Sequence, residues 1–190
     1  MNVLADDILS LREFVETDRL LITGESSMLK EYLSVKDRLF TSDEVAGWKI
    51  TDIKMSFEST RFNMKKNKTT LTLSSGLLGK HQVAPLAAVA SFAFELGLTK
   101  SQIEKGISKT APFPHRMNPY VVSGAQVVDD TYNGNLEGSL AGIALLSDLP
   151  ATRKIYVTPG LVEQGEQKTL VHQQIAKALI TTAPDVVVLM

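Results

Sequence analysis

The most informative part of the sequence runs from Pro112 to Ser139. It reads Pro112-Phe-Pro-His-Arg-Met-Asn-Pro119, then a short apolar segment, then Asp129-Asp-Thr-Tyr-Asn-Gly-Asn135. A proline-rich joint is followed by an apolar strand that opens into a polar loop, and this loop leads into a helix. In parallel α/β sheets, ligands bind at the carboxyl ends of strands, close to helix N-termini. The stretch therefore predicts a boundary between two domains and, directly after it, a candidate ligand-binding loop.

Downstream of the joint, strands and helices alternate regularly. We expect strands at 126–129, 154–157 and 185–189, and helices at 136–146 and 166–180, with Asn135 as the N-cap of the first helix. This order is typical of parallel βαβ units with right-handed crossovers. The last strand is apolar on both faces, so we expect it inside a sheet. On that ground we interpret the chain as a fragment of a longer protein.

Upstream of the joint, the pattern is mixed. Short strands expected at 2–5 and 19–23 alternate with short helices expected at 8–15 and 27–33. Residues 48–75 are rich in alternating β-branched and aromatic positions, with a turn at Asn67-Lys68, which predicts an antiparallel hairpin or meander.

Two helices are expected after this meander. Residues 82–96 are apolar nearly all round, which is typical of a buried helix. Pro85 is tolerated there if it lies in the first turn, where backbone N–H groups have no partner within the helix. Thr99 and Gln102 form a capping-box pattern for a second helix at about 100–108.

The composition is that of an ordinary globular protein. Of the 190 residues, 44% are hydrophobic and 22% are charged, and the formal net charge is -1. This balance argues against a nucleic-acid partner or a membrane-surface role driven by bulk charge. Cysteine is absent, which excludes disulfides, thiolate zinc sites and cysteine nucleophiles. No apolar run approaches the ~20 residues of a membrane span, and the N-terminus lacks a signal-peptide pattern. We therefore expect a cytoplasmic protein without membrane insertion.

The acidic pair at the start of the loop is the first candidate for chemistry. Asp129 and Asp130 follow a strand, where a carboxylate can accept hydrogen bonds from a ribose or help to hold a metal–nucleotide complex. Aspartate is equally common in such loops as turn and capping chemistry, so spacing alone leaves both interpretations open. Tyr132, Asn133 and Asn135 favour the functional one, because they add an aromatic face and hydrogen-bonding amides.

The cationic and glycine-rich candidates are less specific by themselves. Arg116 at a hinge can reach a phosphate, although a structural or solvated arginine is the commoner case. The three histidines, His81, His115 and His172, have no metal-ligand spacing, and we predict no metal site. Residues 79–82 open the apolar helix, where a nucleotide can approach closely. The sequence contains no G-x-x-x-x-G-K-[ST] motif, and thus no phosphate-binding P-loop.

These motifs, taken in order, resemble those of the Mur ligases. The most specific match is Asp129-Asp-Thr-Tyr-Asn-Gly-Asn135, which is similar to the family signature Asp-Asp-(Ser/Thr)-Tyr-Asn-Ala-Asn. Four further stretches resemble family motifs: Val3-Leu-Ala-Asp-Asp7, Leu77-Leu-Gly-Lys-His-Gln-Val83, Pro114-His-Arg116 and Thr158-Pro-Gly-Leu-Val-Glu-Gln-Gly165.

The resemblance implies an α/β fold in two parts. Residues 1–113 would be the second half of the central ATP-binding domain, with its antiparallel β meander and buried helix. Residues 114–190 would be most of the Rossmann-like parallel α/β C-terminal domain. The family's P-loop and its carbamylated lysine would lie upstream of Met1.

The resemblance also implies a set of roles. ATP and Mg2+ would be the cofactors, with the main Mg2+ ligands upstream of this chain. His81 and Gln82 would stand where the family contacts adenine, with Gln82 in place of an Asn. Arg116 would contact phosphate and serve in catalysis, and Asp130 would contact the ribose. Tyr132, Asn133 and Asn135 would line the nucleotide side of the domain crevice.

The implied reaction is the ATP-dependent addition of D-alanyl-D-alanine to UDP-MurNAc-tripeptide through an acyl phosphate, by an enzyme that is a monomer at full length. We expect the 190 residues alone to bind ATP weakly and to lack ligase activity. Two alternatives stay open. One is another Mur-type ligase, similar to folylpolyglutamate synthase or cyanophycin synthetase, against which the Tyr-Asn-x-Asn pattern argues. The other is a non-catalytic binding module derived from such a ligase.

Overall fold

The computed structural model describes residues 5, 9–16, 20–26, 29–34 and 37–190. The chain divides into two compact units. The first comprises Met1–Ile53, Arg61–Ser74 and His81–Lys109, and the second comprises Lys54–Thr60, Ser75–Lys80 and Thr110–Met190. The motif at Val3-Leu-Ala-Asp-Asp7 falls, apart from Ala5, outside the described residues, as does most of the strand expected at 2–5.

The first unit is built on a sheet of six strands in the order β1-β2-β3-β4-β5-β6. Strand β1 (Leu21–Thr23) runs parallel to β2 (Arg38–Phe40), and β3 (Glu44–Val45) is antiparallel to both β2 and β4 (Trp48–Met55). The strand expected at 19–23 is thus confirmed over its described part, whereas the sequence analysis missed β2 and β3. Within the helices expected at 8–15 and 27–33, the described residues form the short 3-10 helices η1 (Ser10–Glu13) and η3 (Lys30–Tyr32).

The meander expected at 48–75 is confirmed. Strands β4, β5 (Thr60–Lys66) and β6 (Thr69–Ser75) are neighbours in the sheet. Asn67 takes a left-handed φ of 53° in the connection between β5 and β6, a conformation that asparagine adopts more readily than most residues. A link this short requires antiparallel strands, because parallel strands need a long crossover.

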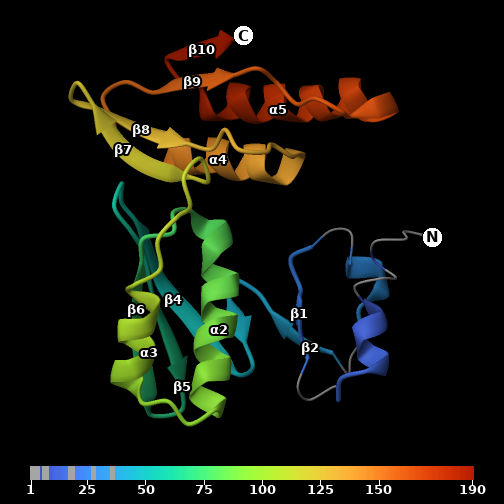
Figure 1. The fold of residues 1–190 in the computed structure, drawn as a ribbon, viewed down its shortest axis with the longest axis vertical. Helices are drawn as coiled ribbons and strands as arrows, with labels where there is room; N and C mark the ends of the chain where they lie inside the picture. The colour runs from blue at the N-terminus through green and yellow to red at the C-terminus, as the bar shows by residue number, and fades with distance from the viewer. Residues whose placement is uncertain (1–4, 6–8, 17–19, 27–28, 35–36) are drawn as a thin grey trace. The chain divides into compact units, whose positions relative to one another are not determined.

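Helices α2 (Val83–Glu95) and α3 (Lys100–Ile107) lie on one face of this meander (Figure 1). Burial alternates along β5 and β6, where Phe62, Met64, Leu71 and Leu73 are buried. Both caps are as expected from the sequence. Gly97 ends α2 with a φ of +85°, and Thr99 with Gln102 forms the capping box of α3.

Helix α2 is buried on one face only, which corrects the expectation from its composition. Val83, Leu86 and Ala90 are buried, whereas Val89 and Phe92 on the opposite face are 61% and 47% exposed. A helix that is apolar all round offers no polar stripe to distinguish its two faces, so its composition alone cannot show how much of it is covered. Pro85 lies in the first turn, as expected.

The second unit contains two pairs of strands. Strands β7 (Asn118–Val122) and β8 (Ala125–Asp129) form an antiparallel hairpin, with Asn118 paired to Asp129. Strands β9 (Ile155–Thr158) and β10 (Val186–Leu189) run parallel. The parallel βαβ pattern is therefore confirmed for β9 and β10. The expected strand at 126–129 corresponds to β8, but its partner is β7, which the sequence analysis missed.

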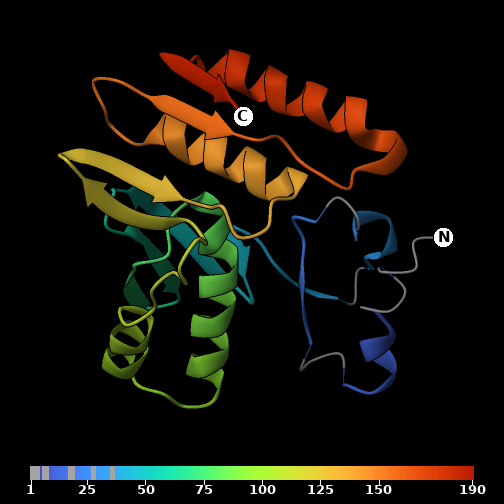
Figure 2. The same cartoon turned by 45° about the horizontal axis from the view of Figure 1, so that its top comes forward.

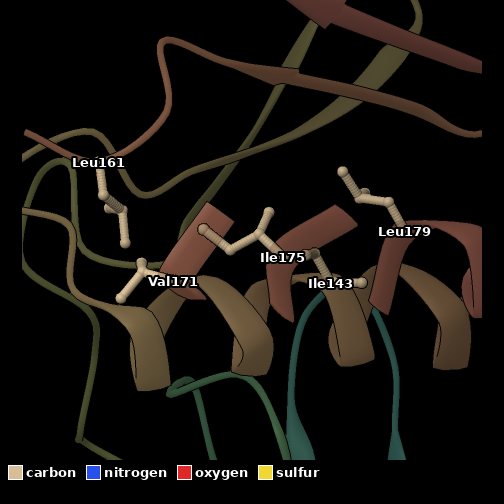
Figure 3. Packing of buried hydrophobic residues seen from close by; sticks show 5 residues of the cluster. All are labelled: Ile143, Leu161, Val171, Ile175 and Leu179. Carbon is tan, nitrogen blue, oxygen red and sulfur yellow. The ribbon is translucent and has the colours of Figure 1, made fainter. Parts of the chain in front are cut away.

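Two helices pack together in this unit (Figure 2). They are α4 (Leu136–Asp148) and α5 (Lys168–Thr182), and the latter follows the short 3-10 helix η5 (Gly165–Gln167). Between them lies a cluster of buried side chains made of Ile143, Leu161, Val171, Ile175 and Leu179. Figure 3 shows these side chains in a row, with Leu161 at one end and Leu179 at the other. A second cluster, Leu78, Met117, Leu145 and Leu149, anchors the joint to α4.

Strand β10 is not internal, contrary to the expectation from its composition. Among the described residues β10 pairs with β9 alone, and Val188 and Leu189 are 40% and 76% exposed. An apolar run predicts that both faces of a strand can be buried, but burial also requires neighbours on both sides.

Candidate functional site

The last residue of β8, Asp129, has a carboxylate with three polar contacts. The side-chain hydroxyl and the backbone N–H of Thr131 donate to Oδ1 of Asp129, at 2.7 Å and 3.1 Å. Nδ1 of His115 lies 2.7 Å from Oδ2 of the same carboxylate. The hydrogen bond from the Thr131 side chain, followed by the contact with His115, lowers the pKa of Asp129 below its ordinary value. Asp129 is therefore ionised and fixed in place.

Arg116 lies between two residues with a left-handed backbone conformation. The residues on either side of it, His115 and Met117, have φ values of 63° and 46°, in the left-handed region that non-glycine residues rarely adopt. Two hydrogen bonds tie these residues to the loop after β8: Tyr132 N–H donates to the His115 carbonyl, and Met117 N–H donates to Oδ1 of Asp130, both at 3.1 Å. The joint and the loop thus form one hydrogen-bonded assembly within the second unit.

The guanidinium of Arg116 stacks on an aromatic ring of the same loop. Its central carbon lies 4.4 Å from the ring centre of Tyr132, in the range of a cation–π contact. Its Nη1 is 3.5 Å from the backbone carbonyl of Asn133. Arg116, Tyr132 and Asn133 are all exposed, so the remaining N–H groups of the arginine face solvent, where an anion can reach them.

Asp130 offers an exposed carboxylate next to this stack. The position lies just beyond the carboxyl end of β8. Burial raises the pKa of Tyr156 in strand β9, and the negative charge of Asp130 adds to the rise. The loop after β8 therefore lies within electrostatic reach of β9.

The last residue of the loop, Asn135, caps the N-terminus of helix α4. Oδ1 of Asn135 accepts a hydrogen bond of 2.7 Å from Gly138 N–H, which confirms Asn135 as the N-cap. The side-chain oxygen is thus engaged in the cap. Gly134 allows close approach, because a Cβ built there would lie 2.7 Å from the Leu161 side chain. The loop after β8 and the loop after β9 are therefore in contact.

The two adenine-site candidates belong to the first unit. His81 and Gln82 are in the short 3-10 helix η4 (Lys80–Gln82) that precedes α2, and Nε2 of Gln82 is 3.0 Å from Nε2 of His81. The structure thus brings together Arg116, Asp130, Tyr132 and Asn133 in the second unit, and His81 with Gln82 in the first.

Sequence reasoning missed the His115–Asp129 pair. Both residues were considered singly, but nothing in a separation of fourteen positions indicates contact. The pairing of Asn118 with Asp129 in the β7–β8 hairpin brings the two together. Recognising β7 from the sequence would have placed His115 near the end of β8.

In the part of the chain that the structure describes, no three His, Asp or Glu residues gather as a metal site, and no helix is long and apolar enough to cross a membrane. An exposed carboxylate, an arginine fork and an aromatic face are the groups that recognise hydroxyls, phosphates and planar bases. The assembly around Arg116 therefore has the chemistry of a nucleotide-binding surface.

Comparisons with known proteins point to one family. No protein-family model matches the chain. The UDP-N-acetylmuramoyl-tripeptide--D-alanyl-D-alanine ligase of Buchnera aphidicola is 27% identical over 134 residues, which cover 70% of this chain and 29% of that protein. The chain thus spans less than a third of the length of this curated relative.

Solved structures agree with the sequence match. A MurF structure from Acinetobacter baumannii has a TM-score of 0.73 at 20% identity and covers 88% of this chain and 37% of that one. A MurF ligase from Thermotoga maritima in complex with ADP has a TM-score of 0.67 at 21% identity and covers 84% and 37%. These matches confirm the mixed α/β fold and the resemblance inferred from the motifs: the chain is similar in sequence and in fold to the UDP-N-acetylmuramoyl-tripeptide--D-alanyl-D-alanine ligases of the Mur ligase family.

Proposed function

We propose that this chain supplies part of the nucleotide site of an ATP-dependent ligase of peptidoglycan synthesis. The reaction joins D-alanyl-D-alanine to UDP-MurNAc-tripeptide through an acyl phosphate. The observation that carries the proposal is the Arg116–Tyr132 stack beside the exposed Asp130 at the end of β8. The sequence match to ligases of this specificity and the fold shared with an ADP-bound MurF support it.

The roles follow from the chemistry of each group. Arg116 would bind a phosphate oxygen through the N–H groups that point away from Tyr132, and its charge would stabilise the transferring phosphoryl group. Asp130 would accept hydrogen bonds from the ribose hydroxyls. Tyr132 and Asn133 would line the nucleotide side of the site. Catalysis of this kind rests mainly on positioning and on neutralising phosphate charge.

We further propose that residues 1–113 are the second half of a Mur ligase central domain and that residues 114–190 are most of its C-terminal domain. His81 and Gln82 contribute to the adenine side. The P-loop motif is absent from this sequence. The phosphate cradle and the main Mg2+ ligands would therefore come from residues outside it, and the 190 residues alone would bind ATP weakly and not catalyse ligation.

Nucleotide titration of the isotope-labelled chain tests the site. We expect ADP to shift the NMR signals of the loop at 129–135 and of Arg116, with an affinity in the high micromolar to millimolar range. Arg116→Ala and Asp130→Ala should each weaken binding by about five- to twentyfold, since a hydrogen bond to a charged group contributes about 1.5–3 kcal/mol when well formed and less when exposed.

Arg153→Ala and Asp43→Ala are matched controls, because both residues are exposed and lie outside the loop. They should leave the affinity unchanged. Equal ADP affinity in all four variants and the parent chain would refute the assignment. ATP-dependent ligation by the chain alone would refute the requirement for residues outside this sequence.

A further inference from the structure

The backbone around Arg116 stores strain. His115 and Met117 are both left-handed, and each such residue without the freedom of glycine costs about 1–2 kcal/mol. Strain of this kind persists only where the surroundings hold it, and it gathers at functional sites.

Met117 is held by burial. Its side chain is 7% exposed and packs with Leu78, Leu145 and Leu149, while its N–H donates to Asp130. His115 has no such packing, because its side chain is 59% exposed. The contacts that hold its conformation are the hydrogen bond from Tyr132 N–H to its carbonyl and the pair between its Nδ1 and Asp129.

The carboxylate end of this pair is firmly placed. The Asp129 side chain is 13% exposed, and its other oxygen is fixed by the two hydrogen bonds from Thr131. A fixed carboxylate can therefore hold its more exposed partner, His115. Because His115 and Arg116 share a peptide bond, the conformation of His115 sets the direction in which the arginine leaves the backbone.

We propose that His115 and Asp129 are positioning residues whose side-chain hydrogen bond holds the left-handed backbone at His115 and thereby sets Arg116 against Tyr132. The pair does not touch the nucleotide. It acts through Arg116, so the inference concerns the arrangement of the phosphate-binding group and rests on the proposed function only for the ligand.

The stack itself supplies a readout that general stability does not. Protons of the Arg116 side chain above the Tyr132 ring experience a ring-current shift, which NMR of the full 190-residue chain measures directly. Tyr132→Leu gives the unstacked reference value. Asp129→Asn removes the charge of the carboxylate but keeps its shape, and His115→Asn keeps a residue that tolerates a left-handed φ while shortening the side chain. In both variants we expect the Arg116 shift to move to the unstacked reference.

Asp185→Asn is the matched control. Asp185 is an aspartate of the same unit whose carboxylate accepts a 2.7 Å hydrogen bond from Lys154 N–H, far along the chain from the joint. This variant should keep the full ring-current shift. Retention of the shift in both Asp129→Asn and His115→Asn would overturn the proposal, whatever the outcome of nucleotide binding.

An ADP titration of the same samples separates the two ideas. If the parent chain binds ADP, Asp129→Asn should weaken binding by about two- to fivefold, the factor that corresponds to an exposed cation–π contact. Loss of the stack with unchanged ADP affinity would overturn the role in nucleotide binding. Loss of the stack in a chain that never binds ADP would leave the positioning pair standing and count against the proposed function alone.

Discussion

His172 in helix α5 and Leu161 in the loop after β9 are hydrogen-bonded: Nε2 of the His172 imidazole accepts a 3.1 Å hydrogen bond from Leu161 N–H. The other ring nitrogen, Nδ1, lies 2.7 Å from the carbonyl of Lys168, so Nδ1 carries the proton. From the sequence, His172 is expected only to lie within the helix at 166–180. The structure instead shows that it fastens the loop after β9 to helix α5.

The hydrogen bond between His172 and Leu161 leaves no room for a side chain at position 160, which is a glycine. Its φ is +79°, and a Cβ there would lie 2.8 Å from Nε2 of His172. We expect Gly160→Ala to destabilise the second unit by about 2–4 kcal/mol, from left-handed strain together with displacement of the imidazole. Urea unfolding followed by the amide NMR signals of α5 measures this.

Gly165→Ala is the control for backbone strain alone, because its φ is +52° and nothing lies within 4 Å of a Cβ there. It should cost about 1–2 kcal/mol. Equal costs at the two positions would mean that the contact with His172 contributes nothing.

Ionisation of Asp129 should contribute to the pH dependence of the free energy of unfolding of the second unit. The pKa of Asp129 in the folded state lies below the ordinary value of an aspartate, chiefly because the Thr131 side chain donates to the ionised form. A lowered carboxyl pKa adds stability above the unfolded value, and this stability is lost as the pH falls through the folded value. We therefore expect the free energy of unfolding of the parent chain to approach that of Asp129→Asn as the pH falls below about 4, the ordinary pKa of an aspartate.

A carboxyl 13C titration provides the direct measurement. The titration midpoint of Asp129 should rise in Thr131→Ala, which removes the hydroxyl donor. A midpoint that stays in place would show that this hydrogen bond does not favour the ionised form.

Core packing between α4 and α5 should dominate the stability of the second unit. Ile143 is 1% exposed in the cluster between these helices. Ile143→Ala should cost about 2–5 kcal/mol, through lost burial and the cavity left behind. Ile180→Ala is the same change at a position that is 78% exposed, and it should stay within about 0.5 kcal/mol of the parent chain. Thermal or urea unfolding compares the two.

The capping box of α3 gives a prediction for the first unit. Thr99 Oγ1 accepts from Gln102 N–H, and the Gln102 side chain accepts from Thr99 N–H at 2.9 Å. Thr99→Ala should destabilise this unit by about 1 kcal/mol. Ser101→Ala, two residues along in the same helix, should be neutral or slightly stabilising because alanine has the higher helix propensity. The fluorescence of Trp48, which lies in this unit, follows the unfolding. If Thr99→Ala left the free energy of unfolding unchanged, water would be replacing the Thr99 hydroxyl as the hydrogen-bond partner at no cost in stability.

Local signals in the sequence were sufficient for much of the fold. The turn at Asn67, the cap at Asn135 and the box at Thr99 each depend on the conformational preference of one or two residues, and each was found where expected. Strand β7 was missed because Pro119 lies inside it and argues against a strand, although a hairpin edge tolerates proline.

Burial was less predictable, because it depends on neighbours and not on the element itself. Helix α2 and strand β10 have the composition of buried elements, yet Val89 and Leu189 are exposed. The same limit applies to the site. The motif identified Asp130 and Tyr132, but the pair between His115 and Asp129 arises from the hairpin register, which composition does not encode.

The parallel pairing of β9 with β10 also has a kinetic consequence. The β7–β8 hairpin joins residues that are neighbours along the chain, whereas Ile155 and Val186 come together only after the whole of α5 has folded back. Closing the longer loop costs more conformational entropy, and non-local pairings form late. We expect β10 to dock last during folding and its amides to exchange with solvent before those of β8.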